Sequence, residues 1–406
     1  MGAEPGTPSV IKNMNRRTVL DTIENGAPIS RADIARITGL SAPTVSAVVK
    51  YLLKRGLVRE VGPGKSRGGR KPGMLQSNPS AAYVLGVDLG SRELTVALAD
   101  LGGRIIQRVS GPAVSKELGS HIAESLRSLA RELILEAGID PRRVMGMGVA
   151  APGVTDPETG VVSLAPALGW ENIRLRDMLF REFGVPICVE NDVNAAALAE
   201  KLFGHGKGLD SFVVVFVGSG LGAGIVVNGE LYRGHMNLAG EIGYMVVDPS
   251  WTQEHGAGFG CLESLTSESV IIDRATVELG MALPETGSDP LRIERLFYLA
   301  SSGNEAARKL LTEVARYLSI GLANLFWVLS PTAIILGGMV AKDNGEVLVA
   351  LIREHLSRIS PRTPELYISE IGKEAGILGA ISISLKEVKM RLLDETFTPQ
   401  LAIGAD

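Results

Sequence analysis

Apolar positions in the first part of the chain recur at helical spacing. The stripe between Val19 and Ile23 predicts an amphipathic helix. A second helix is predicted over Ser30–Gly39, because a serine side chain can cap the first free backbone N–H groups and a glycine suits the left-handed turn after a helix. A third helix is predicted over Ser41–Gly56. The short Gly39–Ser41 link between the second and third helices is typical of a helix-turn-helix.

The third predicted helix separates apolar from polar positions. Its apolar stripe runs from Val45 to Leu53, and the opposite face carries Tyr51 together with small hydroxyl and lysine side chains. Hydroxyl groups can reach base edges or phosphates in a DNA major groove, and lysine neutralises phosphate. We therefore expect this helix to enter the major groove; the alternative is a three-helix module that binds another protein. The expected DNA contacts are Ser41, Thr44, Ser46 and Lys50.

A basic, glycine-rich segment follows the three helices. A strand is predicted over Leu57–Val61, and the next residues read GPGKSRGGRKPG. Such a segment cannot pack a core, but as a wing it could lay cationic side chains along a narrow minor groove. The alternative interpretation is a plain flexible linker. The expected DNA contacts in this segment are Arg67, Arg70 and Lys71.

From Ala82 onward, strand patterns alternate with helical ones. A strand-turn-strand unit is predicted at the start, followed by a helix over Ser115–Ala137 and an apolar strand over Val144–Ala150. A second strand-turn-strand unit, Phe212–Gly234, has the same layout as the first. Two such units predict a duplicated α/β fold with two lobes and a cleft, as in actin and hexokinase. The predicted domains are 1–80 (winged helix-turn-helix with its basic wing), 81–195 (first lobe, completed by the C-terminal segment 381–406) and 196–380 (second lobe).

Composition and charge support a division between the two parts of the chain. The 406 residues are too many for one core, and the net charge of −4 hides an asymmetry. Residues 1–80 carry 13 Lys and Arg against 5 Asp and Glu, so the remainder carries a net charge of −12. A small basic module joined to a large acidic one indicates a nucleic-acid partner for the first module.

The remaining bulk features indicate a cytoplasmic protein. Two cysteines, Cys188 and Cys261, exclude a disulfide framework. The longest apolar stretches have the length of strands, so we expect no membrane-spanning segment. The N-terminal residues MGAEPGTPSV lack the charged start and apolar core of a signal peptide.

A series of motifs, taken in order, resembles one known family. The motifs are SRADIARITGLSAPTVS, GGRKP, GVDLG, APGVTDPETG, ENDVNAAALAE, GSGLGAGIVVNG, AGEIGY, GCLE and ILGG. Each is weak alone, but in this order, between about Asn15 and Ala380, they resemble the ROK family (repressors, open reading frames, kinases). The resemblance is to the family's repressors with an N-terminal winged helix. It implies a winged helix-turn-helix followed by a two-lobed, ribonuclease H-like fold in which the second lobe, 196–380, binds sugar and forms the dimer.

The resemblance also implies a carbohydrate site in the cleft. Asp192 matches the aspartate that acts as general base in the family's kinases, and would be the catalytic residue if this chain were active. The alternative interpretation of Asp192 is a helix cap. Tyr244 stands where the family has a histidine that contacts the sugar and a zinc ion, and a tyrosine hydroxyl can still bind a sugar. The sugar-binding residues implied are Asn191, Asp192, Glu241, Tyr244 and Glu263.

The zinc site and the nucleotide site of the family are both altered in this sequence. Of the cysteines in the family's zinc loop, Cys261 alone is kept, and neutral tyrosine is a poor zinc ligand. His235 and His255 lie nearby, but we expect no metal. In the first phosphate-binding turn, Ser91 and Arg92 replace a glycine and a threonine, so we expect no bound ATP or Mg²⁺. The positions that match the nucleotide site are Asp88, Gly90, Gly218, Ser219, Gly220, Gly337 and Gly338, whose glycines could also serve close packing.

Three functions are compatible with these observations. The first is a repressor that binds palindromic operator DNA as a homodimer or dimer of dimers and responds to a small carbohydrate effector. The second is an ATP-dependent sugar kinase that has kept a DNA-binding domain. The third is a protein-binding scaffold regulated by a phosphotransfer protein. The sequence favours the first.

Overall fold

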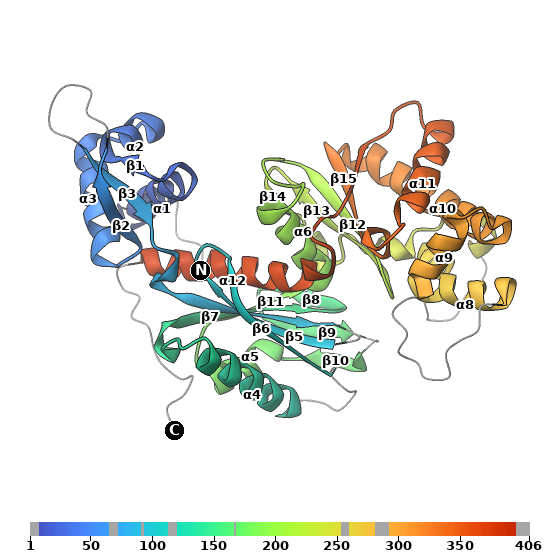
Figure 1. Ribbon diagram of the computed structural model, residues 1–406, viewed down its shortest axis with the longest axis horizontal. Coiled ribbons are helices and arrows are strands. Elements are labelled where there is room, and N and C mark those ends of the chain that lie inside the picture. Colours follow the sequence, from blue (N-terminus) through green and yellow to red (C-terminus); the bar gives the residue numbers. More distant parts are fainter. Residues whose placement is uncertain are drawn as a thin grey trace.

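The structure of the chain is a computed structural model that describes residues 8–64, 72–90, 93–112, 120–165, 168–252, 260–280 and 292–394. Its first part is a winged helix, drawn in blue in Figure 1. The side chain of Ser30 caps one helix by accepting from the Asp33 amide, and that of Ser41 caps the next by accepting from the Thr44 amide. Gly39 has a φ of 69° in the turn between them, a backbone conformation that favours glycine. The elements are α1 (Pro8–Gly26), β1 (Ile29–Ser30), α2 (Arg31–Thr38), α3 (Ala42–Lys54), β2 (Val58–Pro63) and β3 (Gly73–Ser77), and the strands pair antiparallel in the order β1-β3-β2.

The first lobe is a mixed sheet covered on both faces. Within the described residues its strand order is β11-β7-β4-β5-β6, with β4 parallel to β7 and antiparallel to β5. Helices α4 (Ser120–Glu136) and α5 (Leu175–Phe183) lie on one side of the sheet, and the C-terminal helix α12 (Ala375–Leu393) lies on the other (Figure 1). A small antiparallel sheet of order β10-β9-β8 adjoins the lobe. The strands are β4 (Tyr83–Leu89), β5 (Glu93–Asp100), β6 (Ile105–Pro112), β7 (Val144–Ala151), β8 (Val154–Asp156), β9 (Val161–Ala165), β10 (Trp170–Ile173) and β11 (Ile187–Asn191).

The second lobe repeats this layout. Its strand order within the described residues is β14-β13-β12-β15-β16, again a hairpin beside two parallel strands. Val213, Val215 and Val217 face a helical core on one side of the sheet, and Phe212 and Val214 face the opposite side with Ala197 of α6 (Asp192–Phe203). The remaining elements are β12 (Phe212–Val217), β13 (Leu221–Val227), β14 (Glu230–Leu231), α7 (Cys261–Thr266), α8 (Glu268–Leu279), α9 (Arg292–Ser301), α10 (Glu305–Leu329), β15 (Ala333–Gly338), α11 (Glu346–Ile359) and β16 (Glu365–Ile368).

Helices α6 and α12 meet between the two lobes (Figure 1). Gly379 of α12 has no room for a side chain there, because an added Cβ would lie 2.2 Å from the carbonyl oxygen of Ala195 in α6. The two helix backbones are therefore in direct contact. The predicted fold, a winged helix followed by a duplicated two-lobed α/β body, is confirmed. Among the described residues no helix is both long and apolar enough to cross a bilayer.

Candidate functional site

Two adjacent polar residues begin α6 at the edge of the first-lobe sheet. Asn191 ends β11 and caps the helix, because its Oδ1 accepts from the amides of Val193 and Asn194 at 3.0 Å. Its Nδ2 donates to the Gly153 carbonyl and to Oδ1 of Asp192. Asp192 is the first helical residue, and its Oδ1 also accepts from the Val193 amide at 2.9 Å. The capping role considered for Asp192 therefore belongs mainly to Asn191, which holds the Asp192 carboxylate in place.

The charge of Asp192 acts on carboxyl groups from two other parts of the chain, Asp88 and Glu241. Burial raises the pKa of Asp192 to about 6. Burial, followed by the charges of Asp192 and Glu263, raises the pKa of Glu241. Burial also raises the pKa of Glu263, and burial together with the charges of Asp192 and Glu93 raises the pKa of Asp88 to about 7. The structure thus brings Asp88, Asp192, Glu241 and Glu263 to one acidic region, whose oxygens suit hydroxyl donors and repel phosphate.

Both side-chain and backbone contacts hold the start of α7, which carries Glu263. Oε2 of Glu263 accepts from the Leu221 amide at 2.8 Å, which ties the start of α7 to the start of β13. Sγ of Cys261 accepts from the Val247 amide at 3.4 Å, and the Leu262 amide donates to the Met245 carbonyl. An added Cβ on Gly260 would lie 2.4 Å from Cα of Tyr244, so the two backbone segments pack without a gap. These contacts hold the segment from Gly260 to Glu263 against β13 and the residues around Tyr244.

Cys261 and His235, which were considered as metal ligands from the sequence, lie in different environments. Cys261 is buried and bonded as described, while His235 is exposed at the start of a short 3-10 helix (His235–Asn237). In the described ranges no group of three or more His, Cys, Asp and Glu side chains could hold a metal ion. His255 lies outside these ranges, so the expected absence of zinc stays a prediction.

Tyr244 lies beside the acidic region with its side chain largely in solvent. It ends a 3-10 helix (Ile242–Tyr244) that follows Glu241, and it is 64% exposed. An exposed tyrosine ring can stack on a sugar face and its hydroxyl can donate or accept a hydrogen bond. The exposed Tyr244 side chain is therefore accessible to a sugar, and its role as a sugar contact stays a prediction.

The glycines that match a nucleotide site have packing reasons of their own. An added Cβ on Gly338, whose φ is 73°, would lie 2.2 Å from the Val217 carbonyl oxygen, and one on Gly337 would lie 3.2 Å from the Phe216 ring. Gly218 and Gly220 close a turn through the bond from the Gly218 amide to the Gly220 carbonyl, with Ser219 exposed at its tip. An added Cβ on Gly90 would lie 2.8 Å from the Glu93 carbonyl oxygen. Ser91 and Arg92 lie outside the described residues.

An ion pair that the sequence did not reveal joins the lobes beside Asp192. Glu190, one residue before the Asn191 cap, is 1% exposed, and its Oε2 accepts from Nε of Arg233 at 3.0 Å. Arg233 follows β14 of the second lobe, whereas Glu190 lies on β11 of the first. The partners are 43 residues apart. No local pattern could have identified this pair, because the contact depends on how the two lobes meet.

The side chains predicted to contact DNA from α3 are accessible, and their role in DNA binding stays a prediction. Ser46 and Lys50 are exposed, and Ser41 and Thr44 share a hydrogen bond of 2.8 Å at the start of the helix. Tyr51 does not share this surface, since its hydroxyl donates to the Leu392 carbonyl in α12 at 3.3 Å. The expectation for Tyr51 was wrong because the body of the protein covers that side of α3. Arg67, Arg70 and Lys71 lie outside the described residues.

Both parts of the chain resemble known proteins. The sequence profile of the ROK family matches residues 84–387, and that of the MarR family matches residues 14–68. The xylose repressor of Caldicellulosiruptor bescii is 30% identical over 392 residues, which cover 94% of this chain and 98% of that protein. A solved ROK family transcriptional regulator, a homologue of the Escherichia coli MLC protein, superposes with a TM-score of 0.80 at 28% identity over 94% of this chain and 98% of its own. The ROK hexokinase of Thermus thermophilus superposes with a TM-score of 0.62 at 32% identity over 76% of this chain and 99% of its own.

Proposed function

Since the chain belongs to the ROK family, we propose that it is a sugar-responsive transcriptional regulator that binds operator DNA through the winged helix and a carbohydrate in the cleft. One observation carries this proposal. A single chain joins a winged helix with exposed polar side chains on α3 to an acidic region in which the charges of Asp192 and Glu263 raise the pKa of Glu241. We further propose that it acts in the cytoplasm as a homodimer or a dimer of dimers, which suits a palindromic operator.

The cleft favours a neutral polyol as effector. Carboxylate oxygens accept hydrogen bonds and do not donate them, so a cluster of carboxylates suits a ligand with many hydroxyl donors. Asn191 and Tyr244 would add amide and hydroxyl contacts. The same cluster repels a sugar phosphate unless a cation intervenes. The names of the repressor relatives point in the same direction, since one of them is a xylose repressor.

The winged helix supplies the DNA contacts in this proposal. Ser46 and Lys50 lie on the exposed side of α3, and the neighbouring basic segment carries Arg67, Arg70 and Lys71. The hydroxyl groups would contact base edges or phosphates, and the cations would neutralise phosphates in both grooves. Binding should therefore weaken as salt increases, because each neutralised phosphate releases counterions.

The effector would act by changing the relative stability of two lobe arrangements. A ligand shifts such an equilibrium only by its differential affinity for the two arrangements. Asp192 begins the helix between the lobes, and Glu190, two residues earlier in the chain, joins the lobes through its pair with Arg233. A sugar bound at Asp192 thus lies where lobe closure would alter its contacts.

The experiment is a melting-temperature screen against pentoses, hexoses and amino sugars, followed by DNA binding with each hit. DNA fragments are selected from a random duplex pool with the full-length protein. At least one sugar should raise the melting temperature and change the affinity for the selected DNA. Asp192→Ala should lose both responses and keep DNA binding, while Asp177→Ala, an exposed aspartate of the same lobe, keeps both. A normal sugar response in the Asp192→Ala protein, or no affinity for duplex DNA at low salt, would contradict the proposal.

A sugar kinase is the second candidate, favoured by the solved ROK hexokinase and by the closed Gly218–Gly220 turn. In that case Asp192 would take the proton from the sugar hydroxyl that attacks ATP. The packing contacts of Gly90, Gly337 and Gly338 weaken this case, because they explain these glycines without a bound nucleotide. Release of ADP from Mg·ATP that depends on one of the sugar hits would reverse the order of the two candidates.

A further inference from the structure

The winged helix is fastened to the last turn of α12, at the left of Figure 1. Nη1 of Arg16 in α1 donates to the Leu393 carbonyl at 2.8 Å. From α3, Tyr51 donates to the Leu392 carbonyl, and Nη2 of Arg55 donates to the carbonyl of Asp394 at 2.6 Å. Both the first helix and the predicted recognition helix are therefore bonded to the end of the same helix of the body.

These bonds use groups that a helix leaves free. The last carbonyls of an α-helix have no partner within it and carry partial negative charge, so cations are favoured there. Arg16 is 3% exposed, and its guanidinium lies 3.8 Å from the centre of the Tyr51 ring. Nε of Arg55 donates to the Tyr51 hydroxyl at 3.2 Å. We call Arg16, Tyr51 and Arg55 the α12 anchor; Arg16 is buried, and Tyr51 and Arg55 are half-buried.

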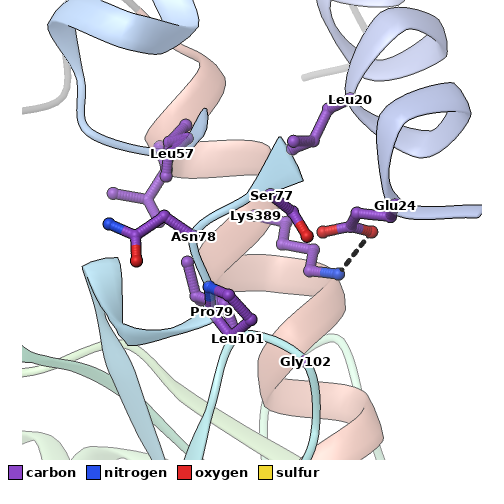
Figure 2. A pocket seen from close by; sticks show the side chains of 10 residues that line it. Leu20, Glu24, Leu57, Ser77, Asn78, Pro79, Leu101, Gly102 and Lys389 are labelled. Atoms are coloured by element: carbon purple, nitrogen blue, oxygen red, sulfur yellow. Dashed lines mark hydrogen bonds and ion pairs between the residues drawn. The ribbon is translucent and has the colours of Figure 1, made fainter. Parts of the chain in front are cut away.

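The connection between the two parts is also tied down. A hollow of about 200 Å³ lies between α1, the connecting residues 77–79 and α12, and Figure 2 shows Glu24 and Lys389 meeting at its edge. Their ion pair measures 2.9 Å. On the other side, the Leu101 amide of the first lobe donates to the Pro79 carbonyl at 3.0 Å. The winged helix is thus held to the first lobe both through α12 and through its own connection.

Helix α12 packs on the first-lobe sheet at glycines that leave no room for a side chain. An added Cβ on Gly148 of β7 would lie 1.9 Å from the Ala380 carbonyl oxygen, and one on Gly86 of β4 would lie 2.6 Å from the Ile381 side chain. At the other end of the helix, a Cβ on Gly376 would lie 2.3 Å from Oδ2 of Asp88 in the acidic region. Helix α12 is therefore in direct contact with the strands of the first-lobe sheet.

The second lobe reaches α12 by a different route. It packs on α6, which begins at Asp192 and touches α12 at Ala195 and Gly379. A change in the angle between the lobes would therefore alter the contact between α6 and α12. The winged helix lies on the α12 side of that contact.

We propose that the α12 anchor makes the winged helix and the first lobe one rigid body, so that the angle between the lobes sets the orientation of the recognition helix. The idea deepens the proposed function by naming the elements that carry the signal, and rests on that function. The alternative is a winged helix joined to the body by a flexible linker alone. In that arrangement, lobe closure would not determine the orientation of the recognition helix.

The first test needs neither sugar nor DNA. Small-angle X-ray scattering is measured on the full-length protein, on Arg16→Gln/Arg55→Gln, and on the control Arg17→Gln, which changes the neighbouring, exposed arginine that pairs with Asp21. The anchor variant should show a larger radius of gyration and a longer maximum dimension, and the control should match the wild type. If the anchor variant does not fold by circular dichroism, Tyr51→Phe/Lys389→Met serves instead, because it removes two contacts without exchanging a buried arginine. Scattering identical to the wild type from a folded anchor variant overturns the proposal.

The second test measures the transmitted signal with a sugar identified by the melting screen. In the wild type and in Arg17→Gln the sugar should change the DNA dissociation constant by about 5- to 150-fold, the usual range of allosteric coupling. In the anchor variant the change should fall below about 2-fold, while the sugar still raises the melting temperature. Full coupling in the anchor variant overturns the rigid-body proposal. A wild type that ignores every sugar contradicts the proposed function instead, and the scattering result then decides the rigid-body proposal by itself.

Discussion

At the scale of single residues, burial raises the pKa of carboxyl groups in the acidic region. Asp88 and Asp192 have pKa values of about 7 and about 6, against an ordinary value of 3.8, and burial is the main cause in both. A carboxyl group in such surroundings binds a proton more tightly in the folded than in the unfolded protein. This cost is typical of residues kept for binding or chemistry, since a core would use an apolar side chain at lower free energy.

The Asp88 carboxyl should make stability fall as pH rises. The unfolded group loses its proton near pH 4 and the folded group near pH 7, so ionisation favours the unfolded state between these values. Asp88→Asn removes this effect. The melting temperature of Asp88→Asn relative to the wild type should therefore increase from pH 5 to pH 8. Asp140→Asn, which changes a solvent-exposed aspartate of lowered pKa, should show no such trend. A constant difference for Asp88→Asn would show that Asp88 ionises normally.

The pair of Glu190 and Arg233 makes a second residue-level prediction. Arg233→Ala leaves a carboxylate that is 1% exposed without its cation, and removing one partner of a buried pair costs about 3–5 kcal/mol. We expect about 3 kcal/mol, the low end, because the Arg233 side chain is 32% exposed. Glu190→Gln/Arg233→Ala should recover most of the loss, since a glutamine still accepts from the Asn194 amide group.

Chemical denaturation measures both effects on the free energy of unfolding. Arg174→Ala breaks an exposed pair of 3.9 Å and should cost less than about 1 kcal/mol. If Arg233→Ala is as mild as Arg174→Ala, then Glu190 does not depend on Arg233 in the folded protein.

At the scale of elements, the sequence predicted what depends on local contacts. The helix starts at Ser30 and Ser41 and the turn at Gly39 were predicted, because capping and left-handed turns involve residues only a few positions apart. The environment of Tyr51 was not predicted, because helix α12, which covers it, comes from the far end of the chain. Likewise Asn191 and Asp192 were identified together, but which of them caps α6 depends on the Gly153 carbonyl, which lies between β7 and β8.

The cap of α3 can be separated from its DNA contact by two matched serine substitutions. Ser41→Ala removes the acceptor for the Thr44 amide and should cost about 1 kcal/mol of stability. Ser46→Ala, on the exposed side of the same helix, should leave stability within about 0.5 kcal/mol and weaken binding to the selected DNA. Urea denaturation and fluorescence anisotropy check the two effects. Equal stability losses from the two substitutions would contradict the capping assignment.

At the scale of the whole molecule, the repeated units of the sequence made the two-lobed body predictable. The contacts between its parts could not be predicted. Two strand-turn-strand units in the sequence, one from Tyr83 and one over Phe212–Gly234, indicated duplicated lobes. The two sheets have the same order of hairpin and parallel strands. The acidic region followed from the family resemblance. The α12 anchor was beyond prediction, because its partners lie more than 300 residues apart in the chain.

The α12 anchor also predicts how the molecule unfolds. A winged helix of fewer than 80 residues has a small core and limited stability of its own. Because Arg16, Tyr51 and Arg55 bond it to α12, and Lys389 pairs with Glu24, its unfolding would expose buried groups of the first lobe as well. Differential scanning calorimetry of the wild type and of Arg17→Gln should therefore show the winged helix melting together with the first lobe. In Arg16→Gln/Arg55→Gln an additional, smaller transition should appear at lower temperature, because losing the coupling lets the small domain unfold alone. A separate low-temperature transition already present in the wild type would mean that the anchor contributes too little free energy to hold the two parts together.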